Sequence, residues 1–325
     1  MQILNSYVNG NHRTIVYDNG TKVKETGHYA VKDGKVTHWV EADDDRFTYD
    51  FPENMEIKIT DKCENGCLYC HMSSVPEGKH GDLRSMEHII SSMVPGTECT
   101  ITGGNPLSHP DLLWFLEKLK ERGIVVNMTI NQRQLKPHKD LICRLVVEKL
   151  VFGLGISLAD SHCKEDFKFI DSLGPNVVIH VVAGIFSKRD LPAVINRRIL
   201  VLGYRDSGRG HTLLEKHKKE IDKNIDWLRK KLPALQGICK IISYDALGLQ
   251  QVNPKKVLSM SDGRYDNIYS AGNTPVMDDA GNITWPSIYI DLPAKTVAYD
   301  AAAETRKELD FEAPVFKLLK TAVTG

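Results

Sequence analysis

From residue 55 to residue 204, short apolar runs alternate with amphipathic segments, and no other feature of the sequence restricts the fold as strongly. The apolar runs are predicted strands at 55–60, 99–102, 125–130, 151–157, 177–183 and 199–204. The segment 110–122 is typical of the helices between them, because Leu112, Leu116 and Leu119 fall on one stripe. About six β/α units in series predict an α/β fold, a partial (β/α)6 barrel whose parallel strands end at one functional edge.

The two ends of the chain lack this alternation. Turn-forming pairs, Asn-Gly at 9–10 and 19–20 and Asp-Gly at 33–34, separate short β-prone runs and predict an N-terminal β-hairpin extension. After the barrel, a turn at 280–282 and a strand at 287–290 predict an irregular α+β segment that caps the barrel. We therefore expect three parts: an N-terminal β extension (1–50), the barrel (51–245) and a C-terminal segment (246–325).

Composition and charge narrow the class of protein. The chain is 42% hydrophobic and 26% charged, as soluble globular proteins are, and it contains no apolar run near the ~20 residues of a spanning helix. Its first residues carry no secretory signal, and seven cysteines, an odd number, indicate reduced thiols rather than disulfides. A formal net charge of zero argues against stable nucleic-acid binding. We therefore expect a cytoplasmic protein without a membrane segment.

Three of the cysteines, Cys63, Cys67 and Cys70, stand in CxxxCxxC spacing on a loop directly after the first barrel strand. Thiolates are the soft ligands that iron–sulfur clusters and zinc both select. A closed zinc site needs four ligands, and the fourth would have to be His71 or a distant residue. Three cysteines on a [4Fe–4S] cubane instead leave one iron open for a substrate or cofactor. The spacing favours the cluster and leaves a structural zinc site as the alternative.

The cysteine loop, with the aromatic Tyr69 before its last cysteine, resembles the radical S-adenosylmethionine (SAM) superfamily. The resemblance extends over the six β/α units and includes a second motif, Gly-Gly-Asn-Pro at 103–106, after the next strand. The family carries a Gly-Gly-Glu motif there, whose backbone binds the amino group of SAM; two glycines alone also permit a tight turn. The resemblance implies a [4Fe–4S] cluster on the three cysteines and SAM as cofactors, with Gly103, Gly104 and Asn105 at the SAM.

The same resemblance places SAM contacts at two further strand ends. Asn131 and Ser157 end the third and fourth strands, where the family has polar contacts to the ribose and carboxylate of SAM. Capping of the helices that follow is the alternative role for both side chains. The implied reaction is reductive cleavage of SAM, with an electron from a reductant such as flavodoxin or ferredoxin, to a 5′-deoxyadenosyl radical that abstracts hydrogen from the substrate.

A glycine-rich loop at 202–210 follows the sixth strand and carries Tyr204, Arg205 and Arg209, our candidates for catalysis or contact with a small-molecule substrate. Arginines in such a loop suit phosphate or carboxylate groups, and the alternative is a surface loop with incidental charge. Over its whole length, the chain resembles uncharacterised radical SAM proteins of bacteria and their phages. This resemblance implies a small anionic substrate such as a nucleoside, nucleotide or modified base. The competing function is a zinc- or cluster-binding interaction protein on a degenerate barrel without SAM turnover.

Overall fold

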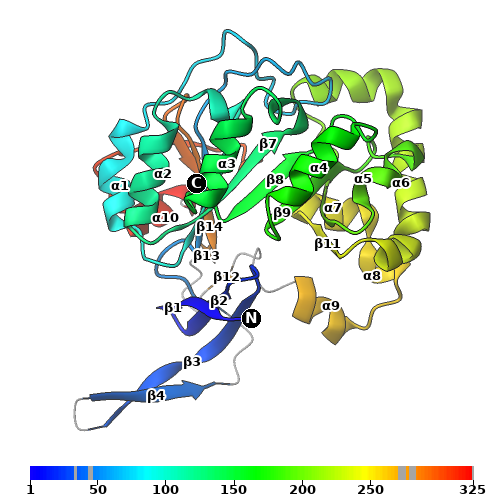
Figure 1. The fold of residues 1–325 in the computed structure, drawn as a ribbon. Coiled ribbons are helices and arrows are strands. Elements are labelled where there is room, and N and C mark those ends of the chain that lie inside the picture. The colour runs from blue at the N-terminus through cyan, green and yellow to red at the C-terminus, as the bar shows by residue number, and fades with distance from the viewer. Residues whose placement is uncertain (33–34, 43–46, 270–275, 278–282, 324–325) are drawn as a thin grey trace.

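The computed structural model describes residues 1–32, 35–42, 47–269, 276–277 and 283–323. Its centre is a ten-stranded sheet, in which consecutive parallel strands form a curved wall (Figure 1). These strands are β5 (Asn54–Lys58), β6 (Glu98–Thr102), β7 (Val125–Asn131), β8 (Gly153–Ser157), β9 (Val177–Val182), β10 (Arg198–Leu202) and β11 (Ile241–Tyr244). Because β5 to β10 are the six strands expected from the sequence and the sheet stays open, the predicted α/β partial barrel is confirmed.

The sheet extends past the six predicted strands on both sides. Next to β10 lies β11, and on the other side β14 (Ser287–Asp291) runs parallel to β5, with Ile290 opposite Ile57. The antiparallel strands β15 (Thr296–Ala298) and β16 (Lys307–Glu308) complete that edge. The C-terminal segment therefore contributes strands to the central sheet. The proposed division of the chain into three parts stays a prediction.

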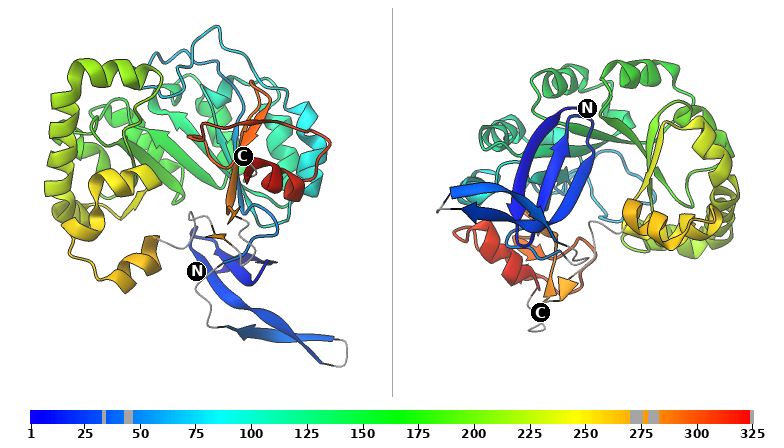
Figure 2. Two further views of the ribbon diagram at one scale, coloured as in Figure 1. Left: turned by 180° about the vertical axis from the view of Figure 1, so that it is seen from behind. Right: turned by 90° about the horizontal axis from the view of Figure 1, so that it is seen from below.

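The helices that connect the parallel strands lie on the outer face of the sheet (Figures 1 and 2). In the described residues the helices are α1 (Glu87–Ser92), α2 (Leu112–Glu121), α3 (Lys139–Val147), α4 (Lys164–Ser172), α5 (Leu191–Val194), α6 (Arg209–Ile238), α7 (Ala246–Val252), α8 (Pro254–Val257), α9 (Asp262–Tyr269) and α10 (Val315–Val323). None of them has both the length and the apolar character needed to cross a membrane.

The two faces of the sheet differ in polarity, and this difference positions the site. Along β7 the side chains alternate, so that Val126, Met128 and Ile130 are buried and the residues between them are partly exposed. A parallel sheet covered by helices on both faces is apolar on both. Here the inner face carries polar groups instead, including Thr102 and Glu56, whose side chains lie 3.5 Å apart. The inner face is therefore available for polar chemistry.

Residues before β5 form a separate four-stranded antiparallel sheet of β1 (Ile3–Asn9), β2 (His12–Tyr17), β3 (Lys22–Lys32) and β4 (Lys35–Glu41). The predicted turns at 9–10 and 19–20 join its first three strands, and the β3–β4 hairpin projects away from the main body (Figure 1). A short two-stranded sheet, β12 (Val276–Met277) with β13 (Ile283–Thr284), precedes β14. The turns predicted at 33–34 and 280–282 lie outside the described residues.

A buried charge cluster connects this N-terminal sheet to the barrel. The carboxylate of Glu53 accepts hydrogen bonds from His12 Nε2 at 3.0 Å and from Thr14 Oγ1 at 2.8 Å, and it pairs with the ammonium group of Lys24. Burial alone would raise the pKa of Glu53. The hydrogen bond from His12 and the charge of Lys24 outweigh it and hold this pKa at about 2.

We expect Glu53→Gln to lower the free energy of unfolding by about 3 kcal/mol, because Lys24 would stay buried without its counter-charge. The folded-state pKa of Glu53 lies below its usual value of 4.5, so its stabilising contribution is present above pH 4.5 and is lost as the pH falls toward 2. Denaturant unfolding from pH 2 to pH 7 measures this loss. Glu25→Gln, which breaks the partly exposed pair with Arg13, should cost about 1 kcal/mol or less. Equal effects of the two variants would contradict this role of Glu53.

Candidate functional site

The three clustered cysteines lie on the loop between β5 and α1, at the edge where the parallel strands end. Backbone hydrogen bonds fix the loop: Cys63 N donates to Val75 O at 2.9 Å, and Cys70 N donates to Cys67 O at 3.2 Å. Cys63 is buried, whereas Cys67 and Cys70 keep some exposure. The loop is therefore held by its own backbone contacts.

The glycine pair at the end of β6 packs directly on this loop. Gly104 N donates to Thr60 O at 2.8 Å, and Asn105 N donates to Lys62 O at 2.7 Å. A Cβ atom on Gly104 would lie 2.2 Å from Lys62 O, and one on Gly103 would lie 2.5 Å from Thr60 O. Any side chain at either position would push the cysteine loop away. The pair is thus required for contact between β6 and the loop, in addition to the SAM contact that we predicted for it.

Asn105 belongs to a chain of amides that ends at a cysteine sulfur. Its side chain is 1% exposed, and Nδ2 donates to Gln134 Oε1 at 3.1 Å. Gln134 Nε2 donates to Asn65 Oδ1 at 2.8 Å, and Asn65 Nδ2 lies 3.5 Å from Cys63 Sγ. Asn105 therefore orients the surroundings of Cys63. Whether it also contacts SAM stays a prediction.

The sulfur of Cys67 has its own amide donor, because Asn131 Nδ2 lies 3.8 Å from Cys67 Sγ. Burial raises the pKa of the Cys67 thiol, and the positive charges of Arg133 and Arg209 act in the opposite direction. Asn131 Oδ1 also accepts from Arg133 N at 3.0 Å, which is the capping role left open above. Asn131 thus combines a cap with a contact to a cysteine.

These features fit a [4Fe–4S] cluster. Each cysteine of such a cluster ligates a different iron, so its three sulfurs surround a cluster instead of meeting at one ion. In the described part of the chain, no three His, Cys, Asp or Glu side chains are arranged to hold a single metal ion. Amide donors to the sulfurs and nearby cations are features that tune such clusters.

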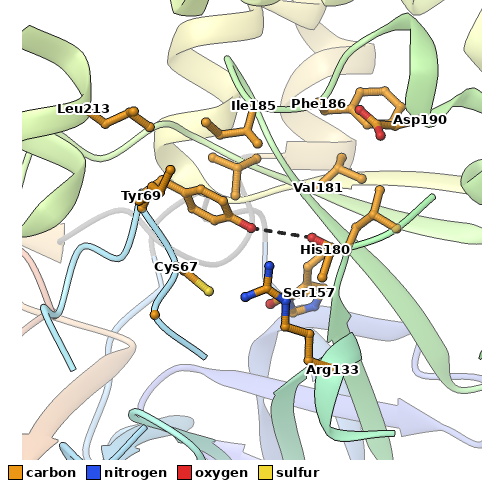
Figure 3. Close-up of a pocket in the computed structure, with 15 residues that line it drawn as sticks. Cys67, Tyr69, Arg133, Ser157, His180, Val181, Ile185, Phe186, Asp190 and Leu213 are labelled. Atoms are coloured by element: carbon orange, nitrogen blue, oxygen red, sulfur yellow. Dashed lines mark hydrogen bonds between the residues drawn. The ribbon is translucent and has the colours of Figure 1, made fainter. Parts of the chain in front are cut away.

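A cavity of about 360 Å³ lies beside Cys67 and extends across the ends of β8 and β9. We call it the cofactor cavity. Figure 3 shows Tyr69 reaching from the cysteine loop toward these strand ends, with its hydroxyl 3.5 Å from Leu158 O. Ser157, a predicted SAM contact, lines the cavity. The other predicted SAM contacts, Gly103, Gly104, Asn105 and Asn131, are not among its lining residues and contact the cysteine loop instead.

His180 also lines this cavity, and our sequence interpretation missed it. Its ring packs over Gly155, where a Cβ atom would lie 2.2 Å from the ring. Burial lowers the pKa of His180 to about 4, so the ring is neutral at pH 7. Its buried Nδ1 atom has no hydrogen-bond partner among the described residues. The available signal was a single polar residue inside the apolar run Val177–Val182, on the inward-facing register of β9.

Our three catalytic candidates in the loop at 202–210 make different contacts. Tyr204 is buried and its hydroxyl donates to Gly210 O at 2.7 Å, which indicates a structural role. Arg209 donates through Nε to Cys67 O at 2.8 Å and through its backbone N to Cys70 O at 3.0 Å, so it clamps the cysteine loop. Arg205 instead lines a second cavity, and its guanidinium group lies 3.7 Å from the carboxylate of Asp245.

The sequence model of the Radical SAM superfamily matches residues 57–238, which is more than half of the chain. The chain therefore belongs to the radical SAM superfamily, as the resemblance implied. Enzymes of this superfamily use a [4Fe–4S] cluster and SAM, so the predicted cofactors are confirmed at the level of the family.

Individual relatives match smaller parts of the chain. A probable GTP 3′,8-cyclase of Sulfolobus acidocaldarius is 32% identical over 139 residues, which is 41% of this chain and 42% of that protein. One from Pyrococcus horikoshii is 26% identical over 135 residues, 41% of each chain. This chain thus matches about two-fifths of the length of these relatives.

Among solved structures, SuiB of Streptococcus suis bound to its precursor peptide SuiA has a TM-score of 0.57 at 16% identity, over 83% of this chain and 65% of that one. SuiB bound to SAM has a TM-score of 0.54 at 16% identity, over 83% and 66% of the two chains. At this identity the likeness shows the shared fold.

We expect Gly104→Ala to weaken cluster retention by about tenfold, because the added methyl group would collide with Lys62 O and displace the cysteine loop. Iron and sulfide content after anaerobic reconstitution measures this effect. Gly237→Ala, on α6 with no atom within 4 Å of the added Cβ, is the matched control and should retain wild-type iron. Full iron content in Gly104→Ala would show that the contact between β6 and the loop is dispensable.

Proposed function

We propose that this chain is a radical SAM enzyme in which Cys63, Cys67 and Cys70 hold the cluster and the cofactor cavity receives the nucleoside part of SAM. The observation that carries the proposal is that one cavity has a cluster cysteine, Cys67, and the ends of β8 and β9 in its walls. A ligand that binds the iron through one end needs a cavity beside the cluster to receive its other end. The volume of about 360 Å³ lies in the usual range for small-molecule sites.

The lining of the cofactor cavity suits an adenosine group. Tyr69, Ile185 and Phe186 offer aromatic and apolar surface for a purine ring, while Ser157 and His180 offer polar atoms for ribose hydroxyls. Because His180 is neutral at pH 7, it does not repel the sulfonium charge of SAM. These residues bind and orient the cofactor and exclude water from it.

The bound cluster and SAM supply a 5′-deoxyadenosyl radical, formed with one electron from an external reductant such as flavodoxin or ferredoxin, which abstracts hydrogen from the substrate. We propose a small anionic substrate such as a nucleoside, nucleotide or modified base. Partial similarity to probable GTP 3′,8-cyclases and the guanidinium group of Arg205, whose ion pair with Asp245 is 3.7 Å long, support this choice. We also propose that the enzyme works in the cytoplasm, because its seven cysteines are free thiols.

Anaerobically reconstituted protein should release 5′-deoxyadenosine from SAM when dithionite is added, and Cys67→Ala should reduce the release to background because the cluster loses a protein ligand. Chromatography of the quenched reaction measures the product. Cys143→Ala, which removes a thiol on α3, is the matched control and should keep wild-type release. Stoichiometric zinc in place of iron, or full release by Cys67→Ala, would contradict the proposed function.

His180→Ala should weaken SAM binding by about five- to tenfold, because it removes a polar side chain that lines the cofactor cavity. Gly155→Ala should act in the same direction without removing the imidazole, since its methyl group would displace the ring. Calorimetric titration of the reconstituted protein with SAM gives the dissociation constants. The exposed His162 serves as control through His162→Ala. An unchanged affinity in both cavity variants would place the adenosine elsewhere.

A further inference from the structure

A second cavity, of about 470 Å³, also borders the cysteine loop. Cys67 and Tyr69 of this loop line the cofactor cavity, and His71 and Met72, which follow them in the sequence, line the second cavity. Its remaining walls come from the ends of β5 and β14, the loop after β10 and the segment before β16. The two cavities are therefore both lined by the cysteine loop, through neighbouring residues.

Two of the charged side chains in the second cavity already neutralise each other. Lys58 Nζ lies 2.5 Å from Asp61 Oδ1 and 3.0 Å from Asp291 Oδ2. Asp291 Oδ2 also lies 3.5 Å from Arg306 Nη1. These contacts tie the ends of β5 and β14 together, and they leave Lys58 and Asp291 with little charge to offer a ligand.

Arg205 is in a different position. Its only ion pair with a described residue is with Asp245 Oδ2 at 3.7 Å, which is longer than a hydrogen bond. The other carboxylate oxygen of Asp245 accepts from Gly203 N at 2.8 Å and Gly248 N at 2.6 Å, so Asp245 is held by the backbone. The guanidinium group carries five N–H donors, and the Arg205 side chain is 34% exposed at the cavity. Among the residues that the structure describes, Arg205 has no other ion-pair partner, so most of these donors are available to a ligand.

Arg306 adds a second guanidinium group to the same cavity. It lies 5.0 Å from the ring centre of Tyr289, and its Nη2 atom donates to Ala301 O at 2.9 Å. Its side chain remains 31% exposed. The lining residues include three cationic side chains, Lys58, Arg205 and Arg306, and two carboxylates, Asp206 and Asp291. The lining therefore carries a net positive charge.

We propose that the second cavity is the substrate site and that Arg205, with Arg306, binds a carboxylate or phosphate group of a small metabolite. This inference rests on the proposed function, because it gives the radical its target. Guanidinium forks match carboxylate and phosphate oxygens in pairs, and the volume suits a metabolite rather than a macromolecule. The position of the cavity beside the cysteine loop places the substrate next to the cofactor, as hydrogen transfer requires.

The test is calorimetric titration of the reconstituted, SAM-loaded protein with pyrophosphate and with citrate, which represent the phosphate and the carboxylate source. The wild-type protein should bind at least one probe, and Arg205→Ala should weaken that binding by about tenfold. Arg306→Gln should weaken it in the same direction. Arg205→Lys keeps the charge but loses the fork, so its affinity should fall between those of the wild type and Arg205→Ala. The control is Arg144→Ala on α3, whose exposed partners are Glu117 and Glu148.

The inference is overturned if the wild-type protein binds neither probe, or if both arginine variants bind as the wild type does. Thermal unfolding verifies that each variant is folded, and Arg205→Lys with Arg306→Gln decides the question if Arg205→Ala does not fold. SAM cleavage by the wild-type protein is recorded separately. Cleavage without arginine-dependent binding overturns the substrate site alone, whereas absence of cleavage overturns the proposed function.

Discussion

The site depends on the close contact between the end of β6 and the cysteine loop. The backbone N–H groups of Gly104 and Asn105 donate to the carbonyl groups of Thr60 and Lys62. This close approach requires a glycine at position 104, because a Cβ there would lie 2.2 Å from Lys62 O. Once this contact is made, Asn105 is buried within reach of the amides that lead to Cys63. The loop is therefore ordered by backbone hydrogen bonds and glycine packing.

The second constraint is the unequal polarity of the sheet. Apolar side chains such as Ile57 and Ile101 pack under the helices, while their sequence neighbours Glu56 and Thr102 occupy the inner face. A sheet with only one face covered can expose polar groups without leaving its core open to water. The strand β14 extends this inner face past β5 and brings Asp291 to Lys58. The C-terminal segment thereby supplies one wall of the second cavity.

Local sequence patterns predicted much of the fold and the family. Period and turn residues predicted the six β/α units, and the cysteine spacing with the glycine pair predicted the family, because both signals lie within short segments. The pairing of β14 with β5 was not predictable, since Lys58 and Asp291 are 233 residues apart and no local period records such a contact. His180 was hidden for another reason: one polar residue in a valine-rich strand also fits a satisfied core histidine. Its role follows only from the cavity and from Gly155 beneath it.

The loop at 202–210 shows most clearly what sequence leaves undecided. Two arginines four residues apart looked equivalent, yet Arg209 clamps the carbonyl group of Cys67 while Arg205 faces the second cavity. The difference arises because α6 begins at Arg209, whose side chain and backbone N–H both contact the cysteine loop. Arg205 precedes this helix and lies beside Asp245. One short loop thus contacts the cysteine loop through Arg209 and lines the second cavity through Arg205.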